Sequence, residues 1–495
     1  MSSLAFISFL RGFRHGVSLW CPQSCHQGNE LRFSLKHGIE GDWPKVRRSF
    51  TISCAANADL SKDYVIVGGG NAAGYAVRAF TEHGVDGSKI CIVSKEKVPP
   101  YERPALTKAY LFPLDKSPAR LPGFHTCVGT GNPRQTDEWY KDKGIQVLYD
   151  TAATGVDLDK KKLFTSSGSS IAYDNLIIAT GASAARLPKT IGGDLQGVHY
   201  IREVADADAL IEALQTCKKL VVIGGGYIGM EVAAAATAWK LDTTMVFPEP
   251  HIMPRLFTPS IADKYEDLFK KYGVRFTKGV TVKRIISGHD GKVSAVELSD
   301  GVVLDADTVV VGIGAKPAVG PFIETGLKMS EGGIEVDGQF RTSSPNVWAI
   351  GDVAAFPLKI YNRITRVEHV DHARKSAQHC VESLLKVQQD PYDYLPYFYS
   401  RVFEHPGSER KVWWQFYGDN VGDVVEVGDF SPKYAAFWIQ SGVLKGVFLE
   451  SGSPEEFGAL PKLARQQPKL DVKKLQSASK VEDALSIALE AAGIV

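Results

Sequence analysis

Two glycine-rich runs carry the residue types and spacing that bind dinucleotides. The first follows the apolar segment 64–67 and has the form GxGxxA, in which Gly68 makes a tight turn, Gly70 admits a close pyrophosphate and Ala73 allows close packing with Gly74. The helix that follows presents free N–H groups and its positive dipole end to the phosphates. Such a run can also be an ordinary turn. The predicted contacts are Gly68, Gly70, Asn71, Ala72 and Ala73.

A second run follows the apolar segment 220–223 and has the full GxGxxG form, with glycines at 224, 226 and 229. Two such runs imply two dinucleotides. The predicted contacts of the second one, a nicotinamide coenzyme, are Gly225, Gly226, Tyr227, Ile228, Gly229, Met230 and Glu231.

An acid follows the next apolar strand in each case. Glu96 comes after the strand 90–93 and is placed to accept hydrogen bonds from ribose hydroxyls. Glu249 comes after the strand 243–247, where a carboxylate accepts from a 2′-hydroxyl and repels a 2′-phosphate. NADH is therefore favoured over NADPH, although the nearby Arg255 would weaken the repulsion of the 2′-phosphate. Alternatively, Glu249 is an ordinary surface acid without this role.

Three further segments read as buried strands that close on small turns: 173–181, 307–317 and 346–353. The second contains Gly314. The third ends in Gly351-Asp352, where the carboxylate can accept from a ribityl hydroxyl of a flavin. Strands alternating with helices predict an α/β fold with two Rossmann-like dinucleotide-binding domains.

The composition of the 495 residues suits a globular protein of two to four domains. The net charge of +1 gives no overall field for nucleic acid or an anionic membrane, and no apolar run is long enough for a membrane span. The seven cysteines show no CxxC or CxxxxC pair in the mature chain, so a redox dithiol, a disulfide framework and a metal site are unsupported. Cys91 is expected to be a buried filler, and no Ser-His-Asp catalytic set is found.

Residues 1–57 differ from the rest of the chain. They contain seven Lys or Arg against three acids, with scattered serines and no sustained periodicity. That composition is typical of an organellar transit peptide and predicts a chloroplast (stroma) or mitochondrial location, with removal near Cys54; a disordered tail is the alternative.

The order GxGxxA, ATG, GxGxxG, VGIGAKP and AIGD resembles the two-dinucleotide flavoproteins of the glutathione-reductase structural class. The resemblance implies an FAD-binding domain interrupted by an NAD(P)-binding domain and followed by an α+β interface domain. The expected division is 58–195 (FAD, first part), 196–318 (NAD), 319–385 (FAD, second part) and 386–495 (interface).

Within that class, the stretch 99–108, PPYERPALTK, stands where disulfide reductases carry CxxxxC. It resembles ferredoxin-reductase-like flavoproteins and plant monodehydroascorbate reductases, although its prolines alternatively only stiffen a loop. The segments EHVDHARKSA (368–377) and YLPYFYSR (394–401) resemble the monodehydroascorbate reductases alone.

This resemblance implies an antioxidant enzyme in which NADH reduces FAD by hydride transfer. Reduced FAD then gives single electrons to two monodehydroascorbate radicals, and no obligate protein partner is inferred. The radical is a small anion, for which arginine is a suitable donor. The implied substrate contacts are Arg374, Tyr399 and Arg401. The implied FAD contacts are Arg103, Lys108, Arg202, Glu203, Val370 and Tyr399, and Glu368 and His369 would flank the nicotinamide.

Alternatives remain at this stage. A second hypothesis is an NADH-dependent reductase of a ferredoxin-like iron–sulfur protein. A third is a flavin-bearing signalling or structural protein that has lost turnover. Arg374 is alternatively a surface ion-pair residue, and His372 is alternatively satisfied within the interface domain. The charged stretch 404–411 predicts a solvated hairpin loop that could also alter access to the substrate, and 481–492 predicts a docked helix.

Overall fold

The computed structural model describes residues 31–32, 51–52, 60–113, 115, 127 and 133–494. The chain separates into two units, Met1–Asp59 and Leu60–Val495. In the first unit the described residues are two short strands, β1 (Leu31–Arg32) and β2 (Thr51–Ile52), which pair antiparallel. The rest of the predicted transit segment lies outside the described residues, and all that follows concerns the second unit.

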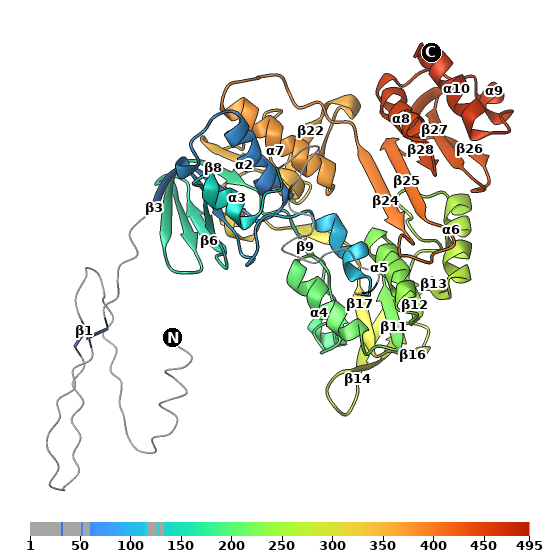
Figure 1. Cartoon of the computed structure of the whole chain (residues 1–495), viewed down its shortest axis with the longest axis horizontal. Helices are drawn as coiled ribbons and strands as arrows, with labels where there is room; N and C mark the ends of the chain where they lie inside the picture. Colours follow the sequence, from blue (N-terminus) through green and yellow to red (C-terminus); the bar gives the residue numbers. More distant parts are fainter. Residues whose placement is uncertain are drawn as a thin grey trace, which may run out of the picture. The chain divides into compact units, whose positions relative to one another are not determined.

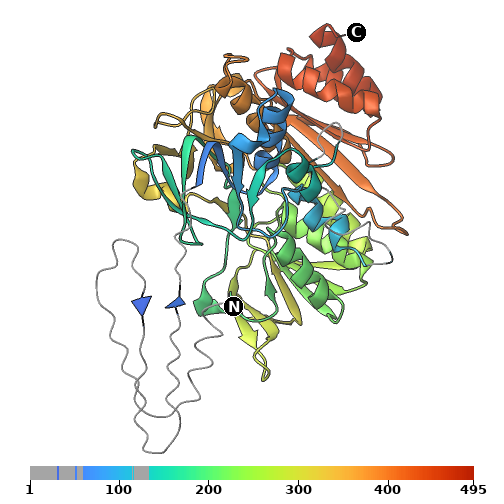
Figure 2. The same cartoon turned by 60° about the vertical axis from the view of Figure 1, so that its left-hand side comes forward.

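The first nucleotide-type sheet combines two distant parts of the chain. Its parallel strands are β5 (Gln146–Leu148), β4 (Ile90–Val93), β3 (Leu60–Val67), β8 (Ser170–Ile178) and β21 (Val347–Ala349). The hairpin β6 (Ala153–Asp157) and β7 (Lys162–Thr165) extends it antiparallel. Of its helices α2 (Asn71–Glu82), α3 (Asp137–Asp142) and α7 (Val370–Leu384), α2 and α7 lie side by side in both views (Figures 1 and 2). Apolar side chains from both parts fill one core, which includes the predicted filler Cys91.

The second nucleotide-type sheet is parallel throughout. Its strands, in order, are β10 (Val198–His199), β17 (Thr308–Val311), β11 (Lys219–Ile223), β12 (Asp242–Phe247) and β13 (Val274–Lys278). The helices α4 (Val204–Leu214), α5 (Tyr227–Ala238) and α6 (Pro259–Lys271) accompany it. The small antiparallel sheet of β14 (Val282–Ser287), β15 (Val293–Leu298) and β16 (Val303–Asp305) follows α6 and β13 in the chain.

The C-terminal part is an antiparallel sheet with helices on one face (Figure 1). The strand order is β24 (Tyr397–Val402), β25 (Val412–Gly418), β28 (Val443–Glu450), β27 (Tyr434–Gln440) and β26 (Asp423–Gly428). The helices are α8 (Pro454–Gln466), α9 (Val472–Gln476) and α10 (Val481–Ala492). The apolar stripe of α10 is buried against this sheet, which confirms the docked helix expected at 481–492. Within the described residues, no helix has the length and apolarity needed to cross a membrane.

Short elements connect the two nucleotide-type sheets. β9 (Ala182–Ala184) pairs antiparallel with β18 (Ala315–Pro317), so the outgoing and returning chains form one ribbon. The four-stranded sheet of β19 (Met329–Ser330), β20 (Gly333–Glu335), β22 (Ala354–Leu358) and β23 (Arg363–Arg366) follows. The 3-10 turns η2 (Arg103–Thr107) and η3 (Ala109–Leu111) pack into the core of the second sheet, against α4 and α5.

Candidate functional site

The two glycine turns have the same local geometry. Gly68 has φ +129°, and a Cβ there would lie 2.2 Å from the carbonyl oxygen of Ala179. Gly224 has φ +116°, and its Cβ would lie 2.3 Å from the carbonyl oxygen of Gly312. Ala179 and Gly312 belong to the ATG and VGIGAKP segments that follow the neighbouring strands. In both halves of the sequence, the glycine turn therefore contacts the segment that follows the neighbouring strand: ATG in the first case and VGIGAKP in the second. Only glycine fits at Gly68 and Gly224, because a Cβ would collide with that segment.

The helices after these turns leave their N-termini open. α2 and α5 begin after Gly70 and Gly226 with no side-chain cap and no acid in the first turn. By contrast, α6 and α8 are capped by the side chains of Thr258 and Ser453, and the Asp206 carboxylate accepts from the backbone at the beginning of α4. A Cβ on Gly226 would meet nothing within 4 Å. Uncapped N–H groups, a positive dipole end and an open backbone fit one pyrophosphate group at each helix.

The first turn of α2 is tightly packed. Asn71, Ala72 and Ala73 are all buried. The Asn71 Oδ1 lies 3.7 Å from the Sγ of Cys127, which donates to it, and a Cβ at Gly74 would lie 2.5 Å from the same sulfur. The Asn71 side chain is thus held by Cys127, which the sequence did not single out.

Several predicted FAD contacts meet at one ionic network. The buried Glu96 carboxylate accepts from the Tyr101 hydroxyl at 2.8 Å and pairs with the Arg103 guanidinium at 2.5 Å. Arg103 also donates to the backbone carbonyl of Arg202 at 2.8 Å, and a Cβ on Gly70 would lie 3.6 Å from its guanidinium. The acid and the glycine turn are therefore adjacent, as a ribose-and-pyrophosphate site requires.

A second ionic pair extends this network. The Asp352 carboxylate accepts from the Arg202 guanidinium at 2.7 Å. Glu203 pairs with Lys95, and its backbone N–H donates to the Asp206 carboxylate at the beginning of α4. Arg202 and Glu203 thereby tie the strand ends of the first sheet to the beginning of α4.

Lys108 and Glu231, which were expected to contact different cofactors, form an ion pair with each other. The buried Glu231 carboxylate lies 2.8 Å from the Lys108 Nζ, and it accepts from the hydroxyls of Thr107 and, at 2.7 Å, Ser400. These four residues, here called the junction cluster, come from the end of η2, from α5 and from β24. The sequence assigned Lys108 to FAD and Glu231 to NAD but missed Thr107 and Ser400. The Glu231 side chain is engaged by the protein, which leaves only its backbone for a direct coenzyme contact.

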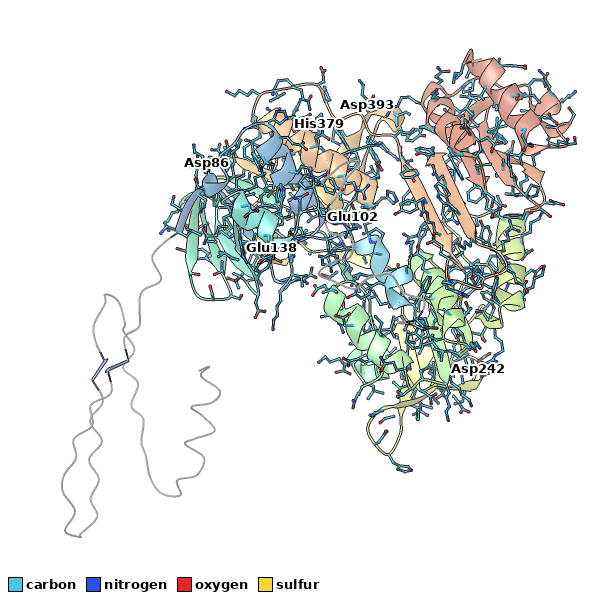
Figure 3. The ribbon with its side chains drawn as sticks, viewed as in Figure 1. Asp86, Glu102, Glu138, Asp242, His379 and Asp393 are labelled. Atoms are coloured by element: carbon cyan, nitrogen blue, oxygen red, sulfur yellow. The ribbon has the colours of Figure 1, made fainter. Side chains whose placement is uncertain are left out.

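Arg374 on α7 forms an ion pair and keeps one donor unused. Its Nη2 lies 2.7 Å from the Glu102 carboxylate, which also accepts from the Tyr75 hydroxyl at 3.0 Å (Glu102 is labelled in Figure 3). The Arg374 Nε is buried and has no hydrogen-bond partner. Burial opposes the charge, but Glu102, Tyr75 and Tyr399 favour it, so that the pKa of Arg374 is raised. A charged guanidinium with a free N–H beside Tyr399 is suited to bind a small anion.

His369 is held neutral at the beginning of α7. Its Nδ1 accepts from the backbone N–H of Asp371, and its ring lies 5.1 Å and 5.5 Å from the rings of Tyr397 and Tyr399. Burial, reinforced by the charges of Lys108 and Arg374, lowers the pKa of His369 to about 3. The ring therefore acts as an acceptor and an aromatic surface rather than as an acid.

Other predicted contacts are distributed around this centre. Val370 is buried as the first residue of α7. Glu368 is exposed and pairs with Arg366. Arg401 is exposed, with its guanidinium 4.5 Å from the Trp413 ring centre and 3.7 Å from Glu404. Arg374 and Tyr399 are thus neighbours, whereas Arg401 lies on the aromatic edge of β24 and β25.

The loop 404–411 connects β24 to β25 as the expected hairpin, and residues 406, 407, 409 and 411 are exposed, but Arg410 and His405 contact the rest of the protein. Arg410 makes two hydrogen bonds, of 2.9 Å and 2.8 Å, to the fully buried Glu450. Its backbone N–H donates to the Tyr272 hydroxyl, and His405 is buried. Arg410 holds this loop against the end of α6 and the C-terminal sheet, and it supplies the partner that the buried Glu450 needs.

The coenzyme side is open at three predicted positions. Glu249 is partly exposed at the end of β12, and Arg255 is exposed, with its carbonyl accepting from Asn420. Gly314 has φ +103°, and a Cβ there would meet nothing within 4 Å. Tyr227 is stacked 5.9 Å from Phe398, which connects the beginning of α5 to β24.

Replacing Glu249 by Ala is expected to raise the efficiency with NADPH relative to NADH. Without the carboxylate that follows β12, a 2′-phosphate is no longer repelled and a 2′-hydroxyl loses its acceptor. Together these changes should shift the ratio of the two efficiencies roughly tenfold or more towards NADPH. The ratio of kcat/KM for the two coenzymes measures this. Glu324→Ala, at an acid outside this sheet, is the control; an unchanged ratio in the Glu249 variant would show that another residue discriminates.

His372 lies among aromatic residues of the core of the first nucleotide-type sheet, within the expected second FAD part. Its side chain is fully buried and stacks 4.5 Å from Phe356, and burial lowers its pKa to about 4 against the opposing charge of Asp352. The unfolded chain binds this proton near pH 6.5. Stability therefore falls as the pH drops from 6.5 towards 4, by about 2 kcal/mol from this residue at pH 5.

Urea unfolding of the FAD-saturated protein at pH 7 and pH 5 measures this loss. The variant His372→Leu is expected to lose less stability between the two pH values than the wild type does. An equal loss in both proteins would contradict the assignment.

Two sheets with parallel central strands, each with a glycine turn and an open helix N-terminus, together with a third antiparallel domain, define an oxidoreductase that binds two dinucleotides. The pyridine nucleotide-disulphide oxidoreductase family model matches residues 62–377, and the model for the monodehydroascorbate reductase 3-like C-terminal domain matches residues 395–482. The chain belongs to the monodehydroascorbate reductase family of these oxidoreductases. The expected fold class and the expected family are therefore confirmed.

The similar proteins agree with this membership. The chain is 62% identical to the Arabidopsis thaliana protein "Monodehydroascorbate reductase, chloroplastic/mitochondrial", over 96% of this chain and 95% of that one. It is 64% identical to the rice protein "Monodehydroascorbate reductase 5, chlorplastic", over 89% and 91%. Among solved structures, putidaredoxin reductase in its covalent complex with putidaredoxin has a TM-score of 0.76 at 28% identity, covering 88% of this chain and 100% of that one.

Proposed function

We propose that this protein is an organellar, FAD-dependent monodehydroascorbate reductase that uses NADH. The observation that carries the proposal is the pairing of Arg374 with Glu102 near Tyr399, which holds a charged guanidinium in place while its side chain stays 30% exposed. High identity to chloroplastic and mitochondrial relatives over nearly the whole chain supports the substrate, and it supports a chloroplast or mitochondrial location.

The residues present fit FAD at the first glycine turn. The open end of α2 would hold the pyrophosphate, the Glu96 and Arg103 network would surround the ribose, and Asp352 would meet the ribityl chain. When bound, FAD supplies the conversion of a two-electron hydride donor into two one-electron transfers. The division of the chain at 195, 318 and 385 is part of this proposal, and it is supported by the grouping of β10–β13 and β17 in one sheet.

The protein's own residues position the reactants. α5 and Gly314 would hold the NADH pyrophosphate, Glu249 its adenosine ribose, and the neutral His369 would border the nicotinamide. Glu231 and Lys108 would fix the junction between the domains on either side of the reacting rings. Arg374 would bind the anionic radical. No acid–base group is required, since the chemistry belongs to the cofactors.

The test is NADH oxidation by the purified, FAD-saturated protein, with and without ascorbate oxidase and ascorbate to generate the radical. Oxidation is expected to accelerate strongly when the radical is present. A small iron–sulfur protein of the ferredoxin type serves as a second acceptor. Unchanged NADH oxidation with the radical, together with rapid reduction of the iron–sulfur protein, would replace the proposal by the alternative of an iron–sulfur protein reductase.

A further inference from the structure

We propose that His251, Asp263 and Glu266 form a Zn²⁺-binding site on the coenzyme-binding side of the second nucleotide-type sheet. His251 lies in the segment 248–258 between β12 and α6, here called the coenzyme loop, and the two acids lie on α6. This site is separate from the glycine turns and the junction cluster, and it does not depend on the proposed reaction.

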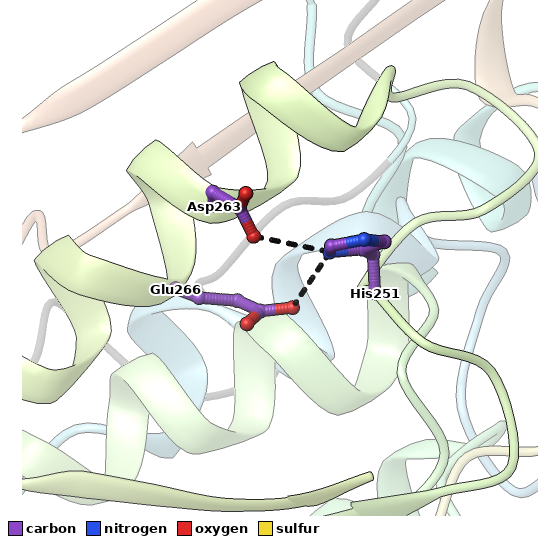
Figure 4. Close-up of side chains that lie close together, drawn as sticks. All are labelled: His251, Asp263 and Glu266. Carbon is purple, nitrogen blue, oxygen red and sulfur yellow. Dashed lines mark ion pairs between the residues drawn. The ribbon is translucent and has the colours of Figure 1, made fainter. Parts of the chain in front are cut away.

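The three donor atoms converge (Figure 4). The His251 Nδ1 lies 3.1 Å from the Asp263 Oδ1 and 3.9 Å from the Glu266 Oε1, and the three ligand atoms all lie within 4.8 Å of one another. A tetrahedral zinc ion with bonds of about 2.0–2.1 Å holds its ligands roughly 3.3 Å apart. Small side-chain rotations therefore bring all three atoms to zinc distance. The spacing of the two acids, one helical turn apart, places both on the same face of α6.

The histidine nitrogen is available for a ligand. The Nδ1 atom of His251 is buried, although the side chain is 27% exposed, and it makes no hydrogen bond; its contacts there are the ion-pair distances to Asp263 and Glu266. Two carboxylate oxygens facing a neutral imidazole nitrogen without a hydrogen bond are poorly satisfied, whereas a cation between the three atoms would bind all of them.

Glu266 is already fixed as a metal ligand should be. It is 1% exposed, its Oε2 pairs with the Lys278 Nζ at 2.7 Å, and its Oε1 accepts from the Ile252 backbone N–H at 3.2 Å. Such outer contacts orient a ligating carboxylate. The positive charge of Lys278 works against a cation, but the two carboxylates leave the group with one net negative charge.

The chemistry of the donors selects the metal. One imidazole nitrogen and two carboxylate oxygens suit Zn²⁺, whereas Mg²⁺ and Ca²⁺ prefer oxygen ligands alone. Three protein ligands leave the fourth position for water, and the Asp263 side chain, 62% exposed, opens the site to solvent. Since the coenzyme loop carries Glu249 and Arg255, a bound ion would fasten this loop to α6.

The experiment measures Zn²⁺ affinity of the full-length, FAD-saturated protein by competition with a chromophoric chelator. His251→Gln and Asp263→Asn are expected to weaken the tight site at least tenfold. Asp267→Asn, at another exposed acid of α6, should leave it unchanged. Zn²⁺ should slow hydrogen exchange of residues 248–258 in the wild type but not in Asp263→Asn, and Mg²⁺ should do neither.

The flavin absorption spectrum shows whether each variant is folded. Folded variants at 251 and 263 that bind Zn²⁺ as tightly as the wild type would overturn the proposal, and so would a wild type without a tight site. Unchanged exchange in the coenzyme loop on Zn²⁺ binding would place the ion elsewhere and also overturn it.

Discussion

Arg374→Ala is expected to lower kcat/KM for the radical by roughly 10- to 100-fold, because a charge-assisted hydrogen bond contributes about 1.5–3 kcal/mol. The variant also leaves the Glu102 carboxylate without its cation, and the remaining negative charge would repel the anionic substrate. Reduction of the flavin by NADH under anaerobic conditions should stay intact, because the coenzyme groups are untouched. Stopped-flow absorbance separates the two half-reactions.

Matched variants sharpen this test. Arg341→Ala removes an exposed arginine that pairs with Asp337, and it should leave both half-reactions unchanged. Arg374→Lys keeps the charge but loses the planar fork, so it should recover only part of the activity. Arg401→Ala is expected to have a smaller effect because its guanidinium is 43% exposed. If Arg374→Ala instead slows flavin reduction by NADH as much as it slows radical turnover, its role is structural.

Glu231→Ala is expected to cost about 3 kcal/mol of stability, because it leaves the largely enclosed Lys108 ammonium, 13% exposed, without its counter-charge. Thr107 and Ser400 lose their acceptor in the same variant. The three parts of the chain that meet at the junction cluster would then be held less firmly, and misplacement of reacting groups by about 1 Å lowers rates by about 100-fold. Chemical denaturation followed by flavin release, together with the rate of flavin reduction by NADH, measures both effects.

The double variant Lys108→Met/Glu231→Ala separates the buried charge from the lost contact. It should be more stable than Glu231→Ala alone, because no unpaired ammonium remains. Lys264→Met, at a lysine of α6 outside the junction cluster, is the control. A double variant no more stable than Glu231→Ala would mean that the unpaired Lys108 ammonium is not the cause of the lost stability.

The two glycine turns were predictable because their signals are local. A turn, the strand before it and the helix after it are contiguous, and the bounds of β4 and α10 agree with the segments 90–93 and 481–492. The sequence also shows that a similar segment, ATG or VGIGAKP, follows each glycine run further along the chain, but it does not show why. Only the structure shows that Ala179 and Gly312 cover the two turns.

The contacts that the sequence did not give join residues far apart in the chain. Tyr75 and Glu102 meet Arg374, and Thr107 and Ser400 meet Glu231, with no periodicity to indicate either. One feature of the sequence could have indicated Glu102 as a site residue: it stands next to Arg103 in the segment PYERPALTK. The charged residues of 404–411 suggested exposure, but Arg410 pairs with Glu450, a buried residue on β28 that is distant in the sequence.

The ribbon of β9 and β18 has a consequence for engineering. Because the chain leaves and returns through two paired strands, the entry and exit of the intervening segment are hydrogen-bonded neighbours. Closely spaced ends are the condition under which a whole module can be inserted or exchanged. Residues 186–314 could therefore be replaced as one cassette from a relative with another coenzyme preference, with the β9–β18 pairing kept as the seam.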